Sequence, residues 1–325
     1  MSSPPLYISG PEVRGLVSMT DLMEAMRPAF QWFSTGRVVQ PLRTTTQFQV
    51  NNQDQNGRLL SMVAYSSDAE SLAVKLLTYF PENMSIHNIQ NLQGIVLLLD
   101  STTGSMRAMI DGVVVTDIRT AAASACAIKV LTLTTPPKTL CIVGSGVQAR
   151  SHLEALTETI SYTRVILWGR NRSHAEQCVR EVGVEGVEVC DSLEEAVRDA
   201  DVIVTVTMPK EPVLYGKWCK PGAVICSVGA SRPDRRELDD ELMHNSVVIV
   251  DTREGALKES GDIIIPQAEI YAELGEIIAG TKTLPTVPGC GKKFIVFKSV
   301  GMAVEDVVSA KLIYDKYIQK RDNKQ

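Results

Sequence analysis

Three cationic side chains in the first part of the chain are candidates for chemistry. Arg43 follows a proline in a strand-like run, Lys75 interrupts the apolar strand pattern of residues 73–77, and Arg119 begins a helix of small residues. An ammonium group is costly to bury unless it is paired, so buried lysines often serve a function. Strand alternation leaves a second interpretation open, in which Lys75 simply faces water.

A glycine turn forms a second candidate site. An apolar strand pattern at residues 139–143 runs into Gly144 and Gly146, and a helix pattern begins directly afterwards. Unpaired backbone N–H groups and the helix dipole stabilise a pyrophosphate at such a helix N-terminus. Inside a series of strands and helices, this pattern predicts dinucleotide binding, and an ordinary strand-to-helix turn is the alternative. The residues expected at the pyrophosphate are Gly144, Ser145, Gly146, Val147 and Gln148.

The segment after the next strand indicates which dinucleotide binds. A site that prefers NAD usually carries Asp or Glu at the end of this strand, where it accepts hydrogen bonds from the ribose. Here the strand pattern of residues 164–168 is followed by Arg170, Asn171 and Arg172. Guanidinium groups stabilise a 2′-phosphate through paired charge-assisted hydrogen bonds. We therefore expect NADPH as the cofactor, with NADH weaker, unless these arginines only cap a solvated loop.

Composition limits the classes of function. The 325 residues are enough for two domains, and a net charge of −5 without long runs of one sign argues against nucleic acid as a partner. No apolar stretch is long enough for a membrane span, and no secretory signal is evident. The seven scattered cysteines favour a reduced, cytoplasmic setting, and the four histidines lack ligand spacing, so we expect no metal.

The first hundred or so residues do not alternate between strands and helices. Apolar side chains at helical spacing predict a helix at residues 20–35. Strand-like runs separated by turn signals follow at residues 41–48, 58–65, 72–80, 95–99 and 106–110. This order of elements predicts an α+β domain.

The second part of the chain alternates regularly, after a helix pattern at residues 116–131. Its strand patterns lie at residues 139–143, 164–168, 187–190, 201–206, 223–228 and 247–250. They predict an α/β fold with a Rossmann-type, doubly wound parallel sheet of about six strands.

The last part of the chain adds a strand pattern at residues 294–297 and a long helix at 302–317. Because the parallel sheet is already complete, we expect this helix to return to the first domain. That domain would be discontinuous, with residues 1–118 and 303–325, and the nucleotide-binding domain would comprise residues 119–302.

Most of the chain resembles the ornithine cyclodeaminase/mu-crystallin family, and within it the mu-crystallin, or ketimine reductase, branch. The resemblance covers the chain from about residue 40 to 315 in long, ungapped blocks. The segments that carry it are residues 40–44, 75–78, 119–122, 144–148, 229–234, 237–242, 256–262 and 297–306.

The resemblance implies an activity and a set of roles. The expected reaction is the NADPH-dependent reduction of a cyclic ketimine carboxylate, such as Δ1-piperideine-2-carboxylate, to a cyclic imino acid. Arg43 and Arg119 would hold the carboxylate, and Lys75 would hydrogen-bond the imine or help to protonate it. The first domain would bind substrate and form a homodimer. Further substrate contacts are expected from Ser231 and Ser299, and further cofactor contacts from Arg119, Thr207, Met208 and Val228.

One position favours the ketimine reductase branch over the cyclodeaminases. Cyclodeaminases carry an acid at the position of Ser231, where it acts on the amine or on water. Imine reduction does not need that acid in the same form. An ornithine cyclodeaminase or an alanine dehydrogenase is therefore disfavoured.

The resemblance also implies a second class of function, since mu-crystallins bind thyroid hormone in the presence of NADPH and serve as lens structural proteins.

Overall fold

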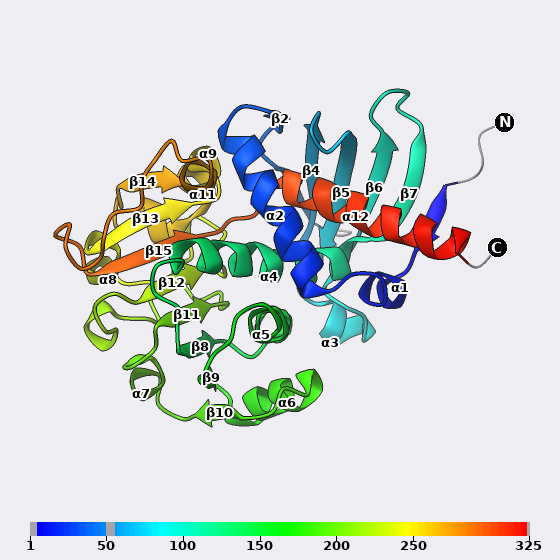
Figure 1. Ribbon diagram of the computed structural model, residues 1–325. Coiled ribbons are helices and arrows are strands. Elements are labelled where there is room, and N and C mark those ends of the chain that lie inside the picture. The colour runs from blue at the N-terminus through cyan, green and yellow to red at the C-terminus, as the bar shows by residue number, and fades with distance from the viewer. Residues whose placement is uncertain (1–4, 50–55, 324–325) are drawn as a thin grey trace. The chain divides into compact units, whose positions relative to one another are not determined.

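The structure is a computed structural model that describes residues 5–49 and 56–323. The chain divides into two compact units: Met1–Arg119 with Met302–Gln325, and Thr120–Gly301. Each unit is built around its own sheet (Figure 1). The predicted α/β class, with a doubly wound parallel sheet and a discontinuous α+β part, is confirmed.

Seven strands form the first sheet within the described residues, in the order β1-β7-β6-β5-β4-β2, and β3 also pairs with β4. All neighbours are antiparallel except β1 and β7. The short strands β1 and β2 were not predicted. The strands are β1 (Leu6–Ile8), β2 (Val38–Val39), β3 (Thr44–Gln49), β4 (Asn56–Ser66), β5 (Ser71–Tyr79), β6 (Leu92–Asp100) and β7 (Met106–Asp111).

Helices cover one face of this sheet. The C-terminal helix α12 (Ala303–Asp322) packs across β4, β5 and β6 and against α2 (Met19–Ser34), as Figure 1 shows. Helix α2 begins at a capping box in which Ser18 and Asp21 satisfy each other's backbone N–H groups. The other helices of this unit are α1 (Gly10–Arg14), α3 (Asn83–His87) and the first part of α4 (Gly112–Leu131).

Eight parallel strands form the second sheet within the described residues, in the order β10-β9-β8-β11-β12-β15-β13-β14. The prediction of about six strands was wrong. Strand β15 lies between β12 and β13, and the sheet also gains β14 at its edge. The strands are β8 (Thr139–Val143), β9 (Arg164–Trp168), β10 (Val187–Cys190), β11 (Val202–Thr205), β12 (Val224–Ser227), β13 (Ser246–Val250), β14 (Ile270–Glu273) and β15 (Phe294–Lys298).

The central strands of this sheet are buried along their whole length, which explains their continuous apolar runs. Short helices and a 3₁₀ turn connect them. These elements are α5 (Val147–Thr159), α6 (Arg172–Val182), α7 (Leu193–Val197), η1 (Gly216–Trp218), α8 (Asp240–His244), α9 (Arg253–Glu259), α10 (Gly261–Ile264) and α11 (Leu274–Ile278).

Candidate active site

Lys75 lies on the buried face of β5. Its side chain alternates in step with Ala73 and Leu77, which are also buried, and it is only 1% exposed. The interpretation that Lys75 faces water is therefore wrong. Its Nζ atom donates a hydrogen bond of 2.8 Å to Oδ1 of Asp306, which is 1% exposed. The buried ammonium thus has the partner that its burial requires.

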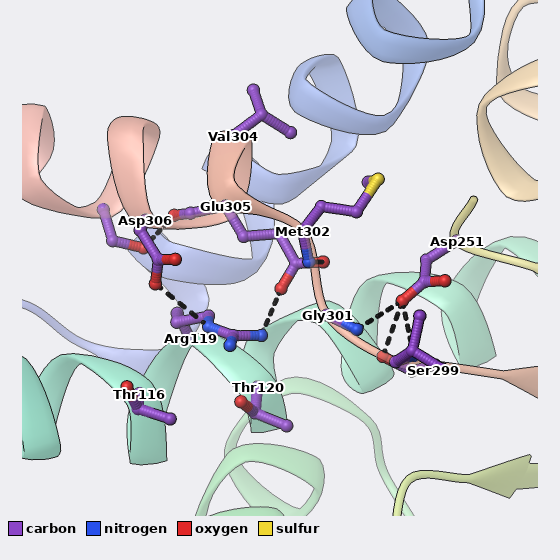
Figure 2. Close-up of polar contacts among 12 residues, drawn as sticks. Thr116, Arg119, Thr120, Asp251, Ser299, Gly301, Met302, Val304, Glu305 and Asp306 are labelled. Atoms are coloured by element: carbon purple, nitrogen blue, oxygen red, sulfur yellow. Dashed lines mark hydrogen bonds and ion pairs between the residues drawn. The ribbon is translucent and has the colours of Figure 1, made fainter. Parts of the chain in front are cut away.

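Arg119 joins the same cluster from α4. Its Nε atom donates to Oδ1 of Asp306 at 3.2 Å, and its Nη1 atom donates to Oε2 of Glu305 at 2.5 Å. Figure 2 shows the Arg119 side chain between these two carboxylates, which lie in the first turn of α12. All three side chains are almost fully buried.

Arg43 lies outside the strand in which the sequence placed it, in the segment just before β3. It is half-buried, and its charge helps to lower the pKa of Lys75. Burial is the largest cause that brings the pKa of Lys75 to about 8, followed by the charge of Arg119, while Asp306 opposes both. The structure thus brings the three predicted cations to one region of the first unit.

The predicted cations of this region influence one another. Lys75 is almost fully buried, and the charges of Arg119 and Arg43 both lower its pKa. Glu305 and Asp306 pair with Arg119, and Asp306 also pairs with Lys75. Because electrostatic attraction is stronger in a buried setting than in water, these cations suit a small ligand that carries a carboxylate.

The glycine turn of the second unit has the geometry of a phosphate cradle. Gly144 has a φ of 137°, and a Cβ atom there would lie 2.8 Å from Cγ2 of Val206, so the backbone itself requires glycine. Gly146 caps α5 without a side-chain hydrogen bond, and a Cβ atom there would meet no atom within 4 Å. The fold therefore does not demand Gly146, whereas close approach of a phosphate does.

The side chains around this turn leave the backbone accessible. Ser145 and Gln148 are half-buried and Val147 is exposed, while the small Ala149 is fully buried between helix and strand. The first N–H groups of α5 are the donors that a pyrophosphate needs. The residues present therefore fit a dinucleotide.

The three residues expected at a 2′-phosphate differ in their surroundings. Arg170 is exposed. The Asn171 side chain caps α6 and accepts hydrogen bonds from the N–H groups of Ser173 and His174. Arg172 already pairs with Glu176 at 2.8 Å and, through Nη1, with Asp191 at 2.6 Å. Of the two arginines, only Arg170 has no ion pair within the described residues.

Glu237 organises the loops that carry the other predicted cofactor residues. Its Oε1 atom accepts from the N–H of Thr207 at 2.6 Å, and its Oε2 atom accepts from the N–H of Gly229 at 2.8 Å. One buried carboxylate thus ties the loop after β11 to the loop after β12. Thr207 and Val228 are half-buried, and Met208 is 56% exposed. These loops lie at the carboxyl ends of neighbouring strands, where open α/β sheets bind ligands.

A buried ion pair lies beside Glu237. Nζ of Lys298 lies 3.2 Å from Oδ2 of Asp262 and donates to Oγ of Ser227 at 3.1 Å. Oδ1 of Asp262 accepts from the N–H groups of Glu237 and Leu238 at 2.7 and 2.9 Å. Burial raises the pKa of Glu237, and the charge of Lys298 works against that rise. This network fixes the carboxyl ends of β12 and β15.

Ser299 is held by a third buried carboxylate, that of Asp251. Oδ2 of Asp251 accepts from Oγ of Ser299 at 3.1 Å and from the N–H groups of Val300 and Gly301 at 2.7 and 2.6 Å, as Figure 2 shows in part. Burial raises the pKa of Asp251, and these donors oppose the rise. The Ser299 side chain is therefore committed to the fold, and its N–H donates to the Ser227 carbonyl at 3.0 Å.

Sequence reasoning gave no role to several of these acids. The missed residues are Glu237, Asp251, Asp262, Glu305 and Asp306, together with Lys298. A usable signal existed for the last two acids, because a buried lysine needs a counter-ion and an acidic pair begins the C-terminal helix.

The sequence of this chain is similar to proteins of one known family. A model of the ornithine cyclodeaminase/mu-crystallin family matches residues 7–321. The chain belongs to this family. Ketimine reductase mu-crystallin of Mus musculus is 47% identical over 323 residues, which cover 98% of this chain and 99% of that protein. Delta(1)-pyrroline-2-carboxylate reductase of Bacillus cereus is 35% identical over 326 residues, with 97% of each covered.

A solved structure is also similar. The Delta(1)-pyrroline-2-carboxylate reductase of Thermococcus litoralis, in complex with NADH and L-proline, superposes with a TM-score of 0.86 at 36% identity. The match covers 97% of this chain and 98% of that one. This member of the ornithine cyclodeaminase/mu-crystallin family is an oxidoreductase.

Two further residues bear on how this family member works. Ser231 is half-buried, and the nearby Asp234 is engaged with Arg232 through two contacts of 3.0 Å. Asp234 is therefore already paired with Arg232, and the position of Ser231 itself carries no acid. His152, interpreted from sequence as structural, is fully buried between Ser124 and the Gln148 carbonyl, and burial lowers its pKa to about 4.

No group of His, Cys, Asp and Glu side chains suited to a metal ion occurs in the part of the chain that the structure describes. In residues 5–49 and 56–323, no helix combines the length and apolar character that a bilayer crossing requires.

Proposed function

We propose that this chain reduces cyclic ketimine carboxylates to cyclic imino acids with NADPH, and that Δ1-piperideine-2-carboxylate is a substrate. The observation that carries the proposal is the proximity of Arg43, Lys75 and Arg119, of which Lys75 and Arg119 are almost fully buried. Relatives named for ketimine and pyrroline-2-carboxylate reduction support the choice of a cyclic imine.

In this proposal the first unit binds the substrate carboxylate. Arg43 and Arg119 provide planar donors that pair with both carboxylate oxygens. Lys75 lies within the same cluster and donates a proton to the imine nitrogen, which makes the imine carbon a better hydride acceptor. Fixing the carboxylate also orients the ring, and such positioning lowers a barrier by as much as about 7–11 kcal/mol.

The second unit binds the nucleotide in this proposal. The backbone of Gly144 and Gly146 and the first turn of α5 hold the pyrophosphate. The loops after β11 and β12, tied together by Glu237, contact the nicotinamide half through Thr207, Met208 and Val228. When bound, the reduced nicotinamide supplies a hydride to the imine carbon. Ser231 and the backbone at Ser299 contact the substrate in this proposal.

The preference for NADPH is assigned to Arg170. Arg170→Ala is expected to weaken NADPH binding about 10- to 100-fold, as loss of hydrogen bonds between charged groups predicts, and to leave NADH binding within twofold. Arg172→Ala is the matched control, because Arg172 is already paired with Asp191 and Glu176. Titrating both nucleotides by fluorescence checks this, and equal losses for NADPH and NADH would remove Arg170 from the 2′-phosphate.

Self-association is the second element of the proposal. Val63, Val74, Leu97 and Met109 pair across β4–β7 and share the sheet face opposite Lys75, and all are partly exposed. Apolar rows of this kind are usually covered by a partner, and a second copy offers the same row. Val74→Lys is therefore expected to convert a homodimer into a monomer in sedimentation equilibrium. A wild-type monomer would contradict this element.

The main test is NADPH oxidation in the presence of Δ1-piperideine-2-carboxylate. NADH is measured in parallel, and ornithine with NAD is the control for a cyclodeaminase. We expect fast consumption of NADPH, slower consumption of NADH and no reaction with ornithine. Tight NADPH binding without turnover would instead assign the chain to the binding or structural class, and competition with thyroid hormone would then be measured.

A further inference from the structure

Asp306 is the one acid that contacts both Lys75 and Arg119 among the described residues. Both cations use the same oxygen, Oδ1, at 2.8 and 3.2 Å. The other oxygen, Oδ2, is buried and has no hydrogen-bond partner within the described residues. A buried carboxylate normally fills both oxygens with donors, so the unfilled oxygen of Asp306 requires an explanation.

We propose that Asp306 is a positioning residue that keeps Lys75 in its ammonium form and aimed at the imine nitrogen. This proposal rests on the proposed function, since it names the group that makes Lys75 a proton donor. The contact crosses 231 residues of sequence and joins the middle of β5 to the first turn of α12. Strand β5 itself contains no acidic residue.

The surroundings of Lys75 explain why a counter-ion is needed. Arg119 from α4 and Arg43 from the segment before β3 both act to remove its proton, as does burial between β5 and α12. Asp306 from α12 is the charged group that opposes them. Without Asp306, the pKa of Lys75 would fall below about 8, and a smaller fraction of the amine would carry the proton near neutral pH. A neutral amine cannot act as a general acid.

In the proposed step, a proton moves from Lys75 to the imine nitrogen. One N–H bond of the Lys75 ammonium breaks and one N–H bond forms at the imine nitrogen. The C=N π electrons become the nitrogen lone pair as hydride adds to carbon, and NADPH is oxidised to NADP+. Lys75 then regains a proton from solvent.

Glu305 provides a matched control. It has the same charge, lies next to Asp306 and pairs with Arg119, but no contact joins it to Lys75 in the described residues. Glu305→Gln is expected to raise KM for the ketimine through Arg119 while the pH dependence of kcat keeps its wild-type position. Asp306→Asn has nearly the same volume as the wild type and removes the charge beside Lys75.

The experiment measures kcat against pH for the wild type, Asp306→Asn and Glu305→Gln in the full chain, with NADPH binding by fluorescence and thermal melting as checks on folding. The wild-type profile is expected to fall on the alkaline side near pH 8, where Lys75 loses its proton. In Asp306→Asn this fall should move at least about 1 unit lower in pH. NADPH affinity should stay within twofold in both variants.

Each outcome bears on one proposal. If the wild type reduces the ketimine and Asp306→Asn keeps the wild-type profile, the role of Asp306 is wrong and the proposed function stands. If the wild type reduces no ketimine at any pH, the proposed function itself fails. Should Asp306→Asn not fold, Asp306→Glu replaces it: the alkaline fall should stay in place while kcat drops at least tenfold, and an unchanged kcat would overturn the proposal.

Discussion

Two lysines are buried against acids, one in each unit, and their surroundings differ. Lys75 shares Asp306 with Arg119, and the second oxygen of Asp306 has no hydrogen bond within the described residues. Lys298 faces Asp262, whose oxygens are filled by two backbone N–H groups, Ser227 and Lys298 itself. Both lysines are almost fully buried, so burial alone does not separate them.

The two clusters differ in how completely the polar atoms of their acids are hydrogen-bonded. The Lys298 cluster uses its acids to hold backbone N–H groups, which is what a structural network does. The Lys75 cluster has a carboxylate oxygen without a hydrogen bond in the described residues, and a lysine whose pKa is lowered to about 8 by burial and by the neighbouring cations Arg119 and Arg43. Groups in that state are typical of sites that bind and protonate a ligand. The comparison therefore predicts that equal substitutions will have different effects.

The largest effect is expected at Lys75. Lys75→Met should reduce ketimine turnover by about 10²- to 10⁴-fold, the usual contribution of a general acid. NADPH affinity should hardly change, and the loss of stability should be small because Asp306 keeps Arg119 at 3.2 Å. Single-turnover kinetics measures the loss of turnover, and a thermal melt measures the loss of stability. Full activity in this variant would contradict the assignment of Lys75 to a reactive cluster.

Lys298→Met should reduce the stability of the protein more than its turnover. It leaves the buried acids Asp262 and Glu237 without their cation, so the free energy of unfolding should fall by about 3–5 kcal/mol. The fraction that stays folded should keep most of its kcat. Denaturant unfolding and active-site titration measure the two quantities. A stable variant with kcat reduced a hundredfold would mean that Lys298, too, takes part in the reaction.

The smallest effect is expected for Ser227→Ala. This change removes the hydroxyl that lies between Lys298, Asp262 and Glu237, and it should lower the free energy of unfolding by about 1–3 kcal/mol. Turnover should stay within about threefold of wild type. Differential scanning calorimetry with steady-state kinetics would sharpen the distinction between a structural and a reactive cluster, and unchanged stability would count against it.

Much of the fold was readable from the sequence because the long elements have strong periodicity. The glycine turn, the first five strands of the second sheet and helix α2 all lie where the patterns predict. The position of β15 was not readable. Four apolar residues show that a strand is buried, but they do not show which neighbours it has. The insertion of β15 between β12 and β13 depends on the chain path, not on local pattern.

The candidate site, too, was predictable in part from the sequence. The sequence indicated that Lys75 needs a partner if buried, but its partner lies 231 residues away and no spacing rule links the two. Arg172 shows the converse. Its side chain looks available in the sequence, and only the fold brings Asp191 within 2.6 Å of it. Residue type predicts what a group can do, while long-range contacts decide whether it is already engaged.

The position of β15 has a consequence for how this chain is made. A ribosome delivers β12 and β13 well before Phe294 emerges, so a nascent chain that ends after β14 holds a five-stranded fragment and a two-stranded fragment with nothing between them. Asp306 emerges later still, and until then Lys75 lacks its counter-ion. Both units are therefore completed only by segments that are translated after β14.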